Sequence, residues 1–427
     1  MKKALIICYY WPPAGGPGVQ RWLKFVKYLR DFEIEPVVYI PENPHYPIVD
    51  KGLEAEIPEG ITILKQPIKE PYRLASFVSK KQTDQISSGI IKDKNKQGLL
   101  QKIMLFVRGN LFIPDARKLW VKPSVNYLVN YLESSPVDVI ITTGPPHSLH
   151  LIGLQLKEQL NLPWVADFRD PWTTIGYQKK LKLTKFSRQK HLNLEFEVLN
   201  KANHILVTSP TTKSDFSKTT NTPITCITNG FDTLYKNDII LDEKFTIAHI
   251  GSLLEDRNPD VLWQVLNELK EEIDDFSKDL SIELTGKVST TVVQTIENHD
   301  LTENLLLPGY VTHQEAIYRQ CSAQLLLLIE IDSYDTQAII PGKVFEYLAS
   351  RRPIIAIGPK DSDIVDILEK THSGTYFTYG NKVALKTAIL EYYNTFKTSG
   401  IPQTTGDLSI YSRKELTRKL SEIIHQF

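Results

Sequence analysis

The stretch Pro341-Gly-Lys-Val-Phe-Glu-Tyr-Leu-Ala-Ser-Arg-Arg-Pro353 combines a turn, a helix and the approach to a strand. Lys343 lies in the first turn of the predicted helix, and Glu346 lies one turn later. A helix N-terminus carries about half a positive charge and unpaired N–H groups, so it suits a phosphate. Lys343 adds a full charge, and Glu346 can accept hydrogen bonds from a ribose diol. The stretch therefore predicts half of a nucleotide-sugar site. The alternative is an ordinary amphipathic helix between two strands.

Strands and helices alternate along the whole chain, which predicts an α/β fold. Residues 3–8 form an apolar run typical of a buried parallel strand, and a loop rich in Pro and Gly and an amphipathic helix follow it. This order begins a doubly wound domain, and it resumes after a polar linker at 236–244. Strands are expected at 3–8, 36–40, 138–143, 163–168, 204–208, 224–228, 245–250, 281–285, 304–307, 323–329, 354–357 and 374–378.

Two Rossmann-like domains facing a central cleft are therefore predicted. With 427 residues, the chain is too long for one core of ordinary size. We expect a first domain at 1–235 and a second domain at 236–408. The remaining residues, 409–427, are expected to end in a helix that begins with a capping box formed by Ser412 and Glu415.

The composition is that of a soluble globular protein, and it excludes several classes. Hydrophobic residues make up 41% and charged residues 23%, and the chain lacks the run of about 20 apolar residues that a spanning helix needs. Cys8, Cys226 and Cys321 lie far apart without metal-ligand spacing, which fits a reducing compartment. No signal-peptide pattern follows Lys2 and Lys3. We expect a cytoplasmic protein without a metal site.

The zero net charge hides an asymmetry between the two halves. Residues 1–235 hold 31 Lys and Arg against 21 Asp and Glu, whereas residues 236–427 hold 19 against 29. Residues 65–125 alone hold 13 basic and 4 acidic side chains. Because aromatic residues do not alternate with the basic ones, the excess favours an anionic membrane surface or an acidic acceptor over nucleic acid. A merely solvated basic face is the alternative.

The segment Leu99-Leu-Gln-Lys-Ile-Met-Leu-Phe-Val-Arg108 belongs to this basic region. Large apolar residues beside Lys102 and Arg108 are typical of a helix that lies in a lipid interface or covers a lipid-linked acceptor. That interpretation predicts peripheral contact with the inner face of the cytoplasmic membrane. The alternative is a core helix of the first domain.

The loops that follow the strands carry the candidate site residues, because open α/β sheets bind ligands at the carboxyl ends of their strands. In the first domain, Gly15, Gly16 and Gly18 precede a helix and allow a sugar or phosphate to approach the backbone. A simple tight turn is the alternative. Arg21, at the start of that helix, can reach an anion.

Two more loops of the first domain carry titratable side chains. His147 and His150 follow a strand, and His147 at the helix start is the better candidate for proton transfer, with a structural role as the alternative for each. Asp167, Arg169 and Asp170 follow the next strand. These charges can bind an acceptor or brace the cleft as an Arg–Asp pair, because burial requires them to be paired.

The loops of the second domain suit a nucleotide. Gly251 opens the loop after the first strand, and Arg257 near the next helix is placed to meet a diphosphate. Tyr310 and Val311 follow a later strand and are candidates for contact with a nucleobase, with Tyr310 as a stacking face. The predicted donor site combines these four with three residues of the 341–353 stretch, Gly342, Lys343 and Glu346. Gly15 and Gly16 of the first domain are also predicted to contact the donor.

The ordered motifs resemble the retaining GT-B glycosyltransferases of the family 4 type over essentially the whole chain. The resemblance rests on Trp11-Pro-Pro-Ala-Gly-Gly-Pro-Gly, Thr143-Gly-Pro-Pro-His, Asp167-Phe-Arg-Asp-Pro-Trp, Thr228-Asn-Gly-Phe-Asp, Pro308-Gly-Tyr-Val and Pro341-Gly-Lys-Val-Phe-Glu-Tyr-Leu-Ala. It implies that the C-terminal domain holds a UDP- or GDP-linked sugar and the N-terminal domain a sugar or lipid-linked acceptor. It also implies a final helix that returns to the first domain, a role in cell-envelope polysaccharide or glycolipid synthesis, and no obligatory cofactor.

The chain departs from this family at the donor sugar. Members usually carry two glutamates separated by seven residues, the second at Glu346, but Ala338 stands where the first would contact the sugar. Asp332 or Asp335 is a candidate substitute. The missing carboxylate also fits a degenerate GT-B protein that serves as a binding or scaffold subunit. A nucleotide-sugar epimerase is a third candidate, although its acid/base set is not evident.

The resemblance further implies which residues carry the chemistry. Of the family's diphosphate-binding pair only the second member has a counterpart, Arg257, and Lys343 can supply the missing charge. Both would stabilise the departing diphosphate by preorganised electrostatics. The family's histidine is replaced by Thr143, so His147 is the candidate for its role.

Overall fold

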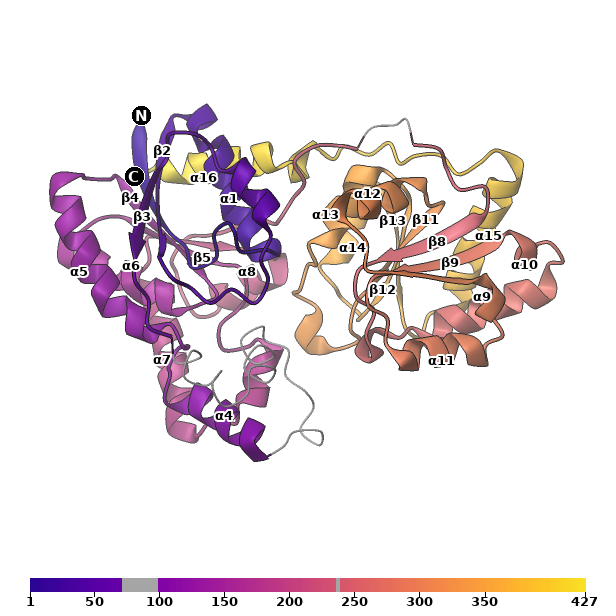
Figure 1. The fold of residues 1–427 in the computed structure, drawn as a ribbon, viewed down its shortest axis with the longest axis horizontal. Helices are drawn as coiled ribbons and strands as arrows, with labels where there is room; N and C mark the ends of the chain where they lie inside the picture. Colours follow the sequence, from indigo (N-terminus) through magenta and orange to yellow (C-terminus); the bar gives the residue numbers. More distant parts are fainter. Residues whose placement is uncertain (71–98, 236–238) are drawn as a thin grey trace. The chain divides into compact units, whose positions relative to one another are not determined.

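The computed structural model describes residues 1–70, 99–235 and 239–427, which form two compact units (Figure 1). Unit 1 comprises Met1–Asn229 together with Arg413–Phe427, and unit 2 comprises Gly230–Ser412. The chain therefore leaves unit 1 near the boundary expected at 235 and re-enters it near the boundary expected at 409. Part of the basic segment at 65–125, residues 71–98, lies outside the described residues.

Unit 1 is built on a seven-stranded parallel sheet with the order β3-β2-β1-β4-β5-β6-β7. The strands are β1 (Lys2–Ile7), β2 (Ile34–Pro41), β3 (Thr62–Gln66), β4 (Val139–Gly144), β5 (Trp164–Phe168), β6 (His204–Val207) and β7 (Ile224–Cys226). The edge strand β3 is not among the expected strands, because its residues are largely half-buried or exposed and lack the apolar run of the central strands.

Helices cover both faces of this sheet. They are α1 (Pro17–Leu29), α5 (Lys118–Ser134), α6 (Ser148–Leu160), α7 (Lys185–Lys201), α8 (Pro210–Ser217) and α16 (Arg413–Ile424), with short 3₁₀ turns η1 (Arg30–Phe32), η2 (Lys51–Glu56) and η4 (Gly176–Leu181). The helix α4 (Leu99–Asn110) instead packs on η4, in a separate small cluster that contains Leu105 and Leu181. Alternate residues of β1 enter different cores: Leu5 and Ile7 pack with α5 and α6, whereas Ala4 and Ile6 pack with α1 and α16. The apolar run of β1 is therefore explained by burial on both faces.

Unit 2 has the same architecture with a six-stranded parallel sheet in the order β10-β9-β8-β11-β12-β13. All six strands were expected: β8 (Phe245–Ile250), β9 (Leu280–Thr285), β10 (Leu305–Gly309), β11 (Leu325–Ile329), β12 (Ile354–Gly358) and β13 (Gly374–Thr378). The helices are α9 (Asp260–Glu272), α10 (Phe276–Asp279), α11 (Thr290–Asn298), α12 (His313–Ser322), α13 (Lys343–Ser350), α14 (Ile364–Thr371) and α15 (Lys382–Thr398). The 3₁₀ turns are η5 (Glu255–Arg257), η6 (Thr302–Asn304), η7 (Tyr334–Thr336) and η8 (Ser409–Tyr411). The prediction of two doubly wound α/β domains is confirmed.

The strand order of each sheet reverses at one point, and these points position the candidate sites. In unit 1 the reversal lies between β1 and β4, and in unit 2 it lies between β8 and β11. Loops at the carboxyl ends of such strands diverge and leave room for a ligand. Within the described ranges, none of the helices combines the length and hydropathy needed to cross a membrane.

Candidate functional site

The side chain of Lys343 lies at the carboxyl edge of the unit 2 sheet, beside the end of β8. Its Nζ atom is 3.3 Å from Nε2 of His249, the penultimate residue of that strand. A Cβ atom at Gly251 would stand 2.7 Å from this Nζ, and Gly251 has a φ of +124°. Both the backbone conformation and the space for Lys343 therefore require glycine at 251.

His249 holds the Lys343 amine in place, and the sequence analysis did not anticipate it. The Nδ1 atom of His249 lies 2.9 Å from the carbonyl oxygen of Leu327, which can only accept a hydrogen bond. The proton therefore resides on Nδ1, and Nε2 presents a lone pair to Lys343. Burial, assisted by the charge of Lys343, lowers the pKa of His249 well below its usual value, so the ring is neutral. In the sequence, His249 stands out as a polar residue within the apolar run 245–250, and this could have marked it as a candidate.

Two cations meet at this edge without an anion to neutralise them. Burial is the main cause that lowers the pKa of Lys343 to about 8, the charge of Arg257 adds to the effect, and Glu346 opposes it. The Nε atom of Arg257 is buried without a hydrogen-bond partner. Neither cation forms an ion pair within 4.0 Å with any residue that the structure describes. An unpaired guanidinium beside an ammonium at the start of α13 is an arrangement that suits an anionic ligand.

The other predicted donor residues lie at the same edge of the sheet. Gly342 is the N-cap of α13, and Glu346 is a half-buried residue whose Oε2 lies 3.4 Å from Nε2 of Gln320. Tyr310 and Val311 follow β10, two strands away from β8. The side chain of Tyr310 is 96% exposed, so its ring is open to a stacking partner. Nucleobase contact by Tyr310 and Val311 remains a prediction.

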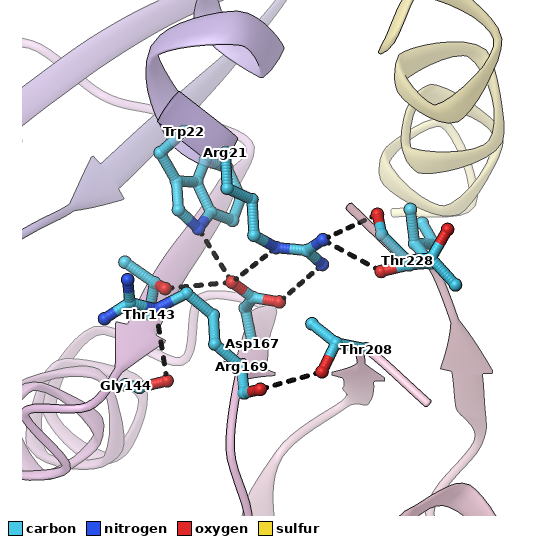
Figure 2. A network of polar contacts seen from close by, with 9 residues as sticks. Arg21, Trp22, Thr143, Gly144, Asp167, Arg169, Thr208 and Thr228 are labelled. Carbon is cyan, nitrogen blue, oxygen red and sulfur yellow. Dashed lines mark hydrogen bonds and ion pairs between the residues drawn. The ribbon is translucent and has the colours of Figure 1, made fainter. Parts of the chain in front are cut away.

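In unit 1, Arg21 and Asp167 form a buried network rather than an open site (Figure 2). Arg21 Nη2 donates to Asp167 Oδ1 at 2.8 Å, while the indole of Trp22 and the hydroxyl of Thr143 donate to Oδ2 at 2.7 and 2.9 Å. Arg21 Nη1 donates to the carbonyls of Ile227 and Thr228. Burial disfavours ionisation of Asp167, but Arg21 and these hydrogen bonds outweigh it and lower the pKa. The geometry is that of a brace joining α1, β4, β5 and the end of β7.

Arg169 and Asp170 are the predicted acceptor residues that are only half-buried. The guanidinium of Arg169 bonds to the Gly144 and Pro145 carbonyls, and a Cβ at Gly18 would lie 2.1 Å from its Nη1. Gly18 thus leaves space for a positive charge at the start of α1. Burial, together with Asp167, raises the pKa of Asp170 against the opposing charge of Arg169. Acceptor binding by these residues stays a prediction.

The predicted histidine and glycines of unit 1 lie in distinct surroundings. His147 is 3% exposed and stacks on Trp172 with ring centroids 4.9 Å apart. Neither of its ring nitrogens has a hydrogen-bond partner in the described part of the chain, and burial lowers its pKa well below the usual value. Gly15 donates to the Ile48 carbonyl at 3.0 Å, whereas Gly16, the N-cap of α1, has open space around it. The proton-transfer role of His147 remains a prediction.

No set of three or more His, Cys, Asp or Glu side chains among the described residues is arranged to hold a metal ion. The candidate residues at the carboxyl edge of the unit 2 sheet are two cations, a helix N-terminus and glycines.

Comparisons with known proteins found one matching family and several structures of similar fold. Residues 95–234 match the model of Glycosyltransferase Family 4. None of the curated proteins compared matches the sequence. Solved structures match the whole chain at low identity. The sucrose-phosphate synthase from Thermosynechococcus elongatus is 13% identical with a TM-score of 0.59, covering 100% of this chain and 99% of that chain.

Two other solved structures show how widely the fold is shared. The lipopolysaccharide outer core galactosyltransferase WaaB is 10% identical with a TM-score of 0.58, covering 100% of this chain and 99% of that chain. A putative UDP-N-acetylglucosamine 2-epimerase from Listeria monocytogenes is 12% identical with a TM-score of 0.55, covering 100% and 96%. The resemblance indicated by the motifs is thus confirmed: the chain has the GT-B fold, and its residues 95–234 match Glycosyltransferase Family 4.

Proposed function

We propose that this chain is a glycosyltransferase that moves a sugar from a nucleoside diphosphate to an acceptor hydroxyl with retention of configuration. The observation that carries the proposal is the pair of cations, Arg257 and Lys343, without an ion-pair partner among the described residues at the start of α13. The match of residues 95–234 to Glycosyltransferase Family 4 supports transfer over the epimerisation that the same fold also serves.

In the proposed reaction, the bond from the anomeric carbon to the diphosphate breaks and a bond to the acceptor oxygen forms, while the proton of the acceptor hydroxyl passes to the departing diphosphate. Negative charge develops on the departing diphosphate. Arg257, Lys343 and the N–H groups that follow Gly342 would stabilise this charge with little reorganisation, because they are already fixed. The neutral Nε2 of His249 would keep the ammonium of Lys343 pointed at the phosphates. Retention is what the family resemblance implies.

Direct binding and turnover measurements test the proposal. Calorimetry with UDP-glucose, UDP-galactose, UDP-N-acetylglucosamine and GDP-mannose should find a donor, and the product should be a glycoside with free nucleoside diphosphate. Lys343→Ala and Arg257→Ala should each lower turnover on the order of a hundredfold, because removing one donor to a developing anion costs about 3–4 kcal/mol. Lys370→Ala, on an exposed helix face of unit 2, is the matched control.

Three outcomes would contradict parts of this proposal. Unchanged turnover of both variants with a verified donor and acceptor would remove the diphosphate role of the two cations. Binding of none of the four nucleotide sugars would favour a scaffold subunit. Formation of an epimer of the donor sugar, with no glycoside, would favour an epimerase.

We further propose that the acceptor is a sugar or a lipid-linked sugar of the cell envelope, with unit 1 touching an anionic membrane. The family match and the similarity to WaaB, named as a lipopolysaccharide galactosyltransferase, support an envelope substrate. In unit 1, Ile103 and Phe106 on α4 and Phe186 on α7 are exposed. The side chain of Lys102, part of the predicted membrane segment, lies outside the described residues.

Liposome flotation tests the membrane proposal. The wild type should float with vesicles that contain anionic phosphatidylglycerol and not with neutral phosphatidylcholine vesicles, because the basic excess and the exposed rings act together. Phe106→Ser with Phe186→Ser should weaken flotation several-fold, since each exposed ring would otherwise bury apolar area in the interface. Val383→Ser, which replaces an exposed apolar residue of unit 2, is the control. Absence of the wild type from both vesicle types would rule the contact out.

A further inference from the structure

Glu330 is a buried carboxyl group at the carboxyl end of β11, the strand that borders the reversal of strand order in unit 2. Its side chain is only 5% exposed. The backbone N–H of Glu330 donates to Ile357 at 2.9 Å, and the Tyr379 hydroxyl donates to the Glu330 carbonyl at 2.8 Å. The position of this residue is therefore fixed by two neighbouring elements.

One carboxylate oxygen of Glu330 is held by hydroxyl groups. Ser362 Oγ and the Tyr376 hydroxyl each lie 2.8 Å from Oε2. A Cβ at Gly358 would stand 2.7 Å from that oxygen and 2.3 Å from the Tyr376 hydroxyl, so glycine at 358 makes the cluster sterically feasible. The Tyr376 hydroxyl also lies 2.8 Å from the carbonyl oxygen of Pro359, so its single proton is shared between two acceptors. The fold thus reserves space for Oε2 beside the hydroxyls of Ser362 and Tyr376.

The second oxygen of Glu330 remains available. No residue that the structure describes hydrogen-bonds to Oε1. Oε1 is not completely buried: the small exposed part of the Glu330 side chain includes this atom. An almost fully buried carboxylate with one free oxygen is costly unless a ligand supplies the missing donor.

Arg257 links Glu330 to the predicted donor residues. Burial raises the pKa of Glu330 to about 7, with the charge of Arg257 among the opposing causes, and the same guanidinium lowers the pKa of Lys343. Yet Glu330 and Arg257 form no ion pair within the 4.0 Å limit. A carboxylate next to a diphosphate site repels phosphate, so the part of the ligand that it faces must be neutral and rich in hydroxyls.

We propose that Oε1 of Glu330 accepts a hydrogen bond from a hydroxyl of the sugar carried by the nucleoside diphosphate. The inference rests on the proposed function and adds a residue that recognises the sugar. Asp332, two residues further along the chain and exposed, was one of the substitutes considered from the sequence. Unlike Glu330, it lies on the surface.

Calorimetry can separate recognition of the sugar from recognition of the nucleotide. Wild type, Glu330→Gln and Asp332→Asn are titrated with UDP and GDP and with UDP-glucose, UDP-galactose, UDP-N-acetylglucosamine and GDP-mannose. Gln keeps an oxygen for Ser362 and Tyr376 but loses the charge. Glu330→Gln should therefore weaken binding of the preferred nucleotide sugar by about tenfold or more, whereas affinity for the free nucleotide should stay the same or rise, because the lost carboxylate no longer repels the diphosphate.

The outcomes distinguish the inference from the function on which it rests. An equal loss for nucleotide and nucleotide sugar would overturn the sugar contact and make Glu330 a positioning residue for Arg257. A sugar-specific loss in Asp332→Asn but not in Glu330→Gln would also overturn it. If the wild type binds none of these compounds, both the proposed function and this inference are wrong. Glu330→Asp, a shorter carboxylate, gives a second test if the Gln variant does not fold, and it should show the same sugar-specific loss.

Discussion

Lys343 is a half-buried cation whose charge depends on pH in an accessible range. Its pKa is lowered to about 8, chiefly by burial, so the free protein loses this proton as pH rises through 8. A diphosphate binds the charged form better and raises the pKa in the complex. We therefore predict that affinity for free UDP or GDP falls above pH 8, by up to about tenfold per pH unit. Calorimetry between pH 7 and 9.5 measures it.

The control for this pH dependence is Lys343→Arg, which stays charged throughout the range. If that variant binds at all, its affinity should be nearly independent of pH between 7 and 9.5. A flat profile for the wild type would mean that Lys343 does not meet the diphosphate.

At the scale of single residues, charge and position in the sequence identify some of the candidate residues and miss others. Lys343 and Arg257 are predicted because each is a cation near a predicted helix start. His249 was missed because it lies within the apolar run of β8, and Glu330 was missed because it directly follows the apolar run of β11, outside the loop motifs singled out in the sequence. Arg21 has the same sequence signal as Arg257, but its partner Asp167, 146 residues away, makes it part of a brace. Pairing over such a distance is not visible in the sequence.

At the scale of elements, α6 packs closely on β4 and β5 through a glycine. A Cβ at Gly153 would lie 2.3 Å from Nε1 of Trp164 and 2.7 Å from Cγ2 of Thr142. Helix propensity favours Ala over Gly by about 1 kcal/mol. Overpacking of a close contact costs about 1–3 kcal/mol. We predict that Gly153→Ala lowers the free energy of unfolding of unit 1, as measured by urea denaturation.

Gly380→Ala is the control, because no heavy atom would lie within 4 Å of its Cβ and its φ is not positive. That change should be neutral or slightly stabilising. A gain of stability in Gly153→Ala would show that α6 can shift away from the sheet and that the close approach is not a constraint.

The elements differ in how well their patterns predict them. The central strands have apolar runs because both faces are buried, and every strand of unit 2 was expected. In the sequence, a helical pattern is evident only at 195–202, whereas α7 begins at Lys185. Its exposed Phe186, Leu192 and Phe196 blur the single apolar stripe that identifies an amphipathic helix. The spacing of apolar residues predicts a helix or a strand reliably where the buried residues recur with the period of that element.

At the scale of the whole molecule, the last helix stabilises the first unit. Leu416, Leu420, Ile423 and Ile424 of α16 join the core cluster of α1 and β1, and Arg413 donates to Gln20 at 3.1 Å. Leu420 is fully buried, so Leu420→Ala should cost unit 1 about 2–5 kcal/mol. Tryptophan fluorescence during urea unfolding can measure this loss, because five of the six tryptophans belong to unit 1.

Ile389→Ala is the control for this prediction. Ile389 is a fully buried residue of α15 in unit 2, so the same chemical change occurs in the other core. It should leave the transition reported by the unit 1 tryptophans largely unchanged. Equal shifts in both variants would mean that the two units unfold as one cooperative body.

The return of the chain to unit 1 has a consequence for synthesis on the ribosome. Unit 2 is an insertion between Asn229 and Arg413, so the sheet of unit 1 emerges first and α16 is translated only after unit 2. Domains generally fold as they are made, from the N-terminus onward. A nascent chain of any length short of α16 therefore leaves the apolar face of α1 uncovered, available to chaperones and proteases. The first unit is therefore completed only after the whole of unit 2 has been made, although its sheet precedes unit 2 in the sequence.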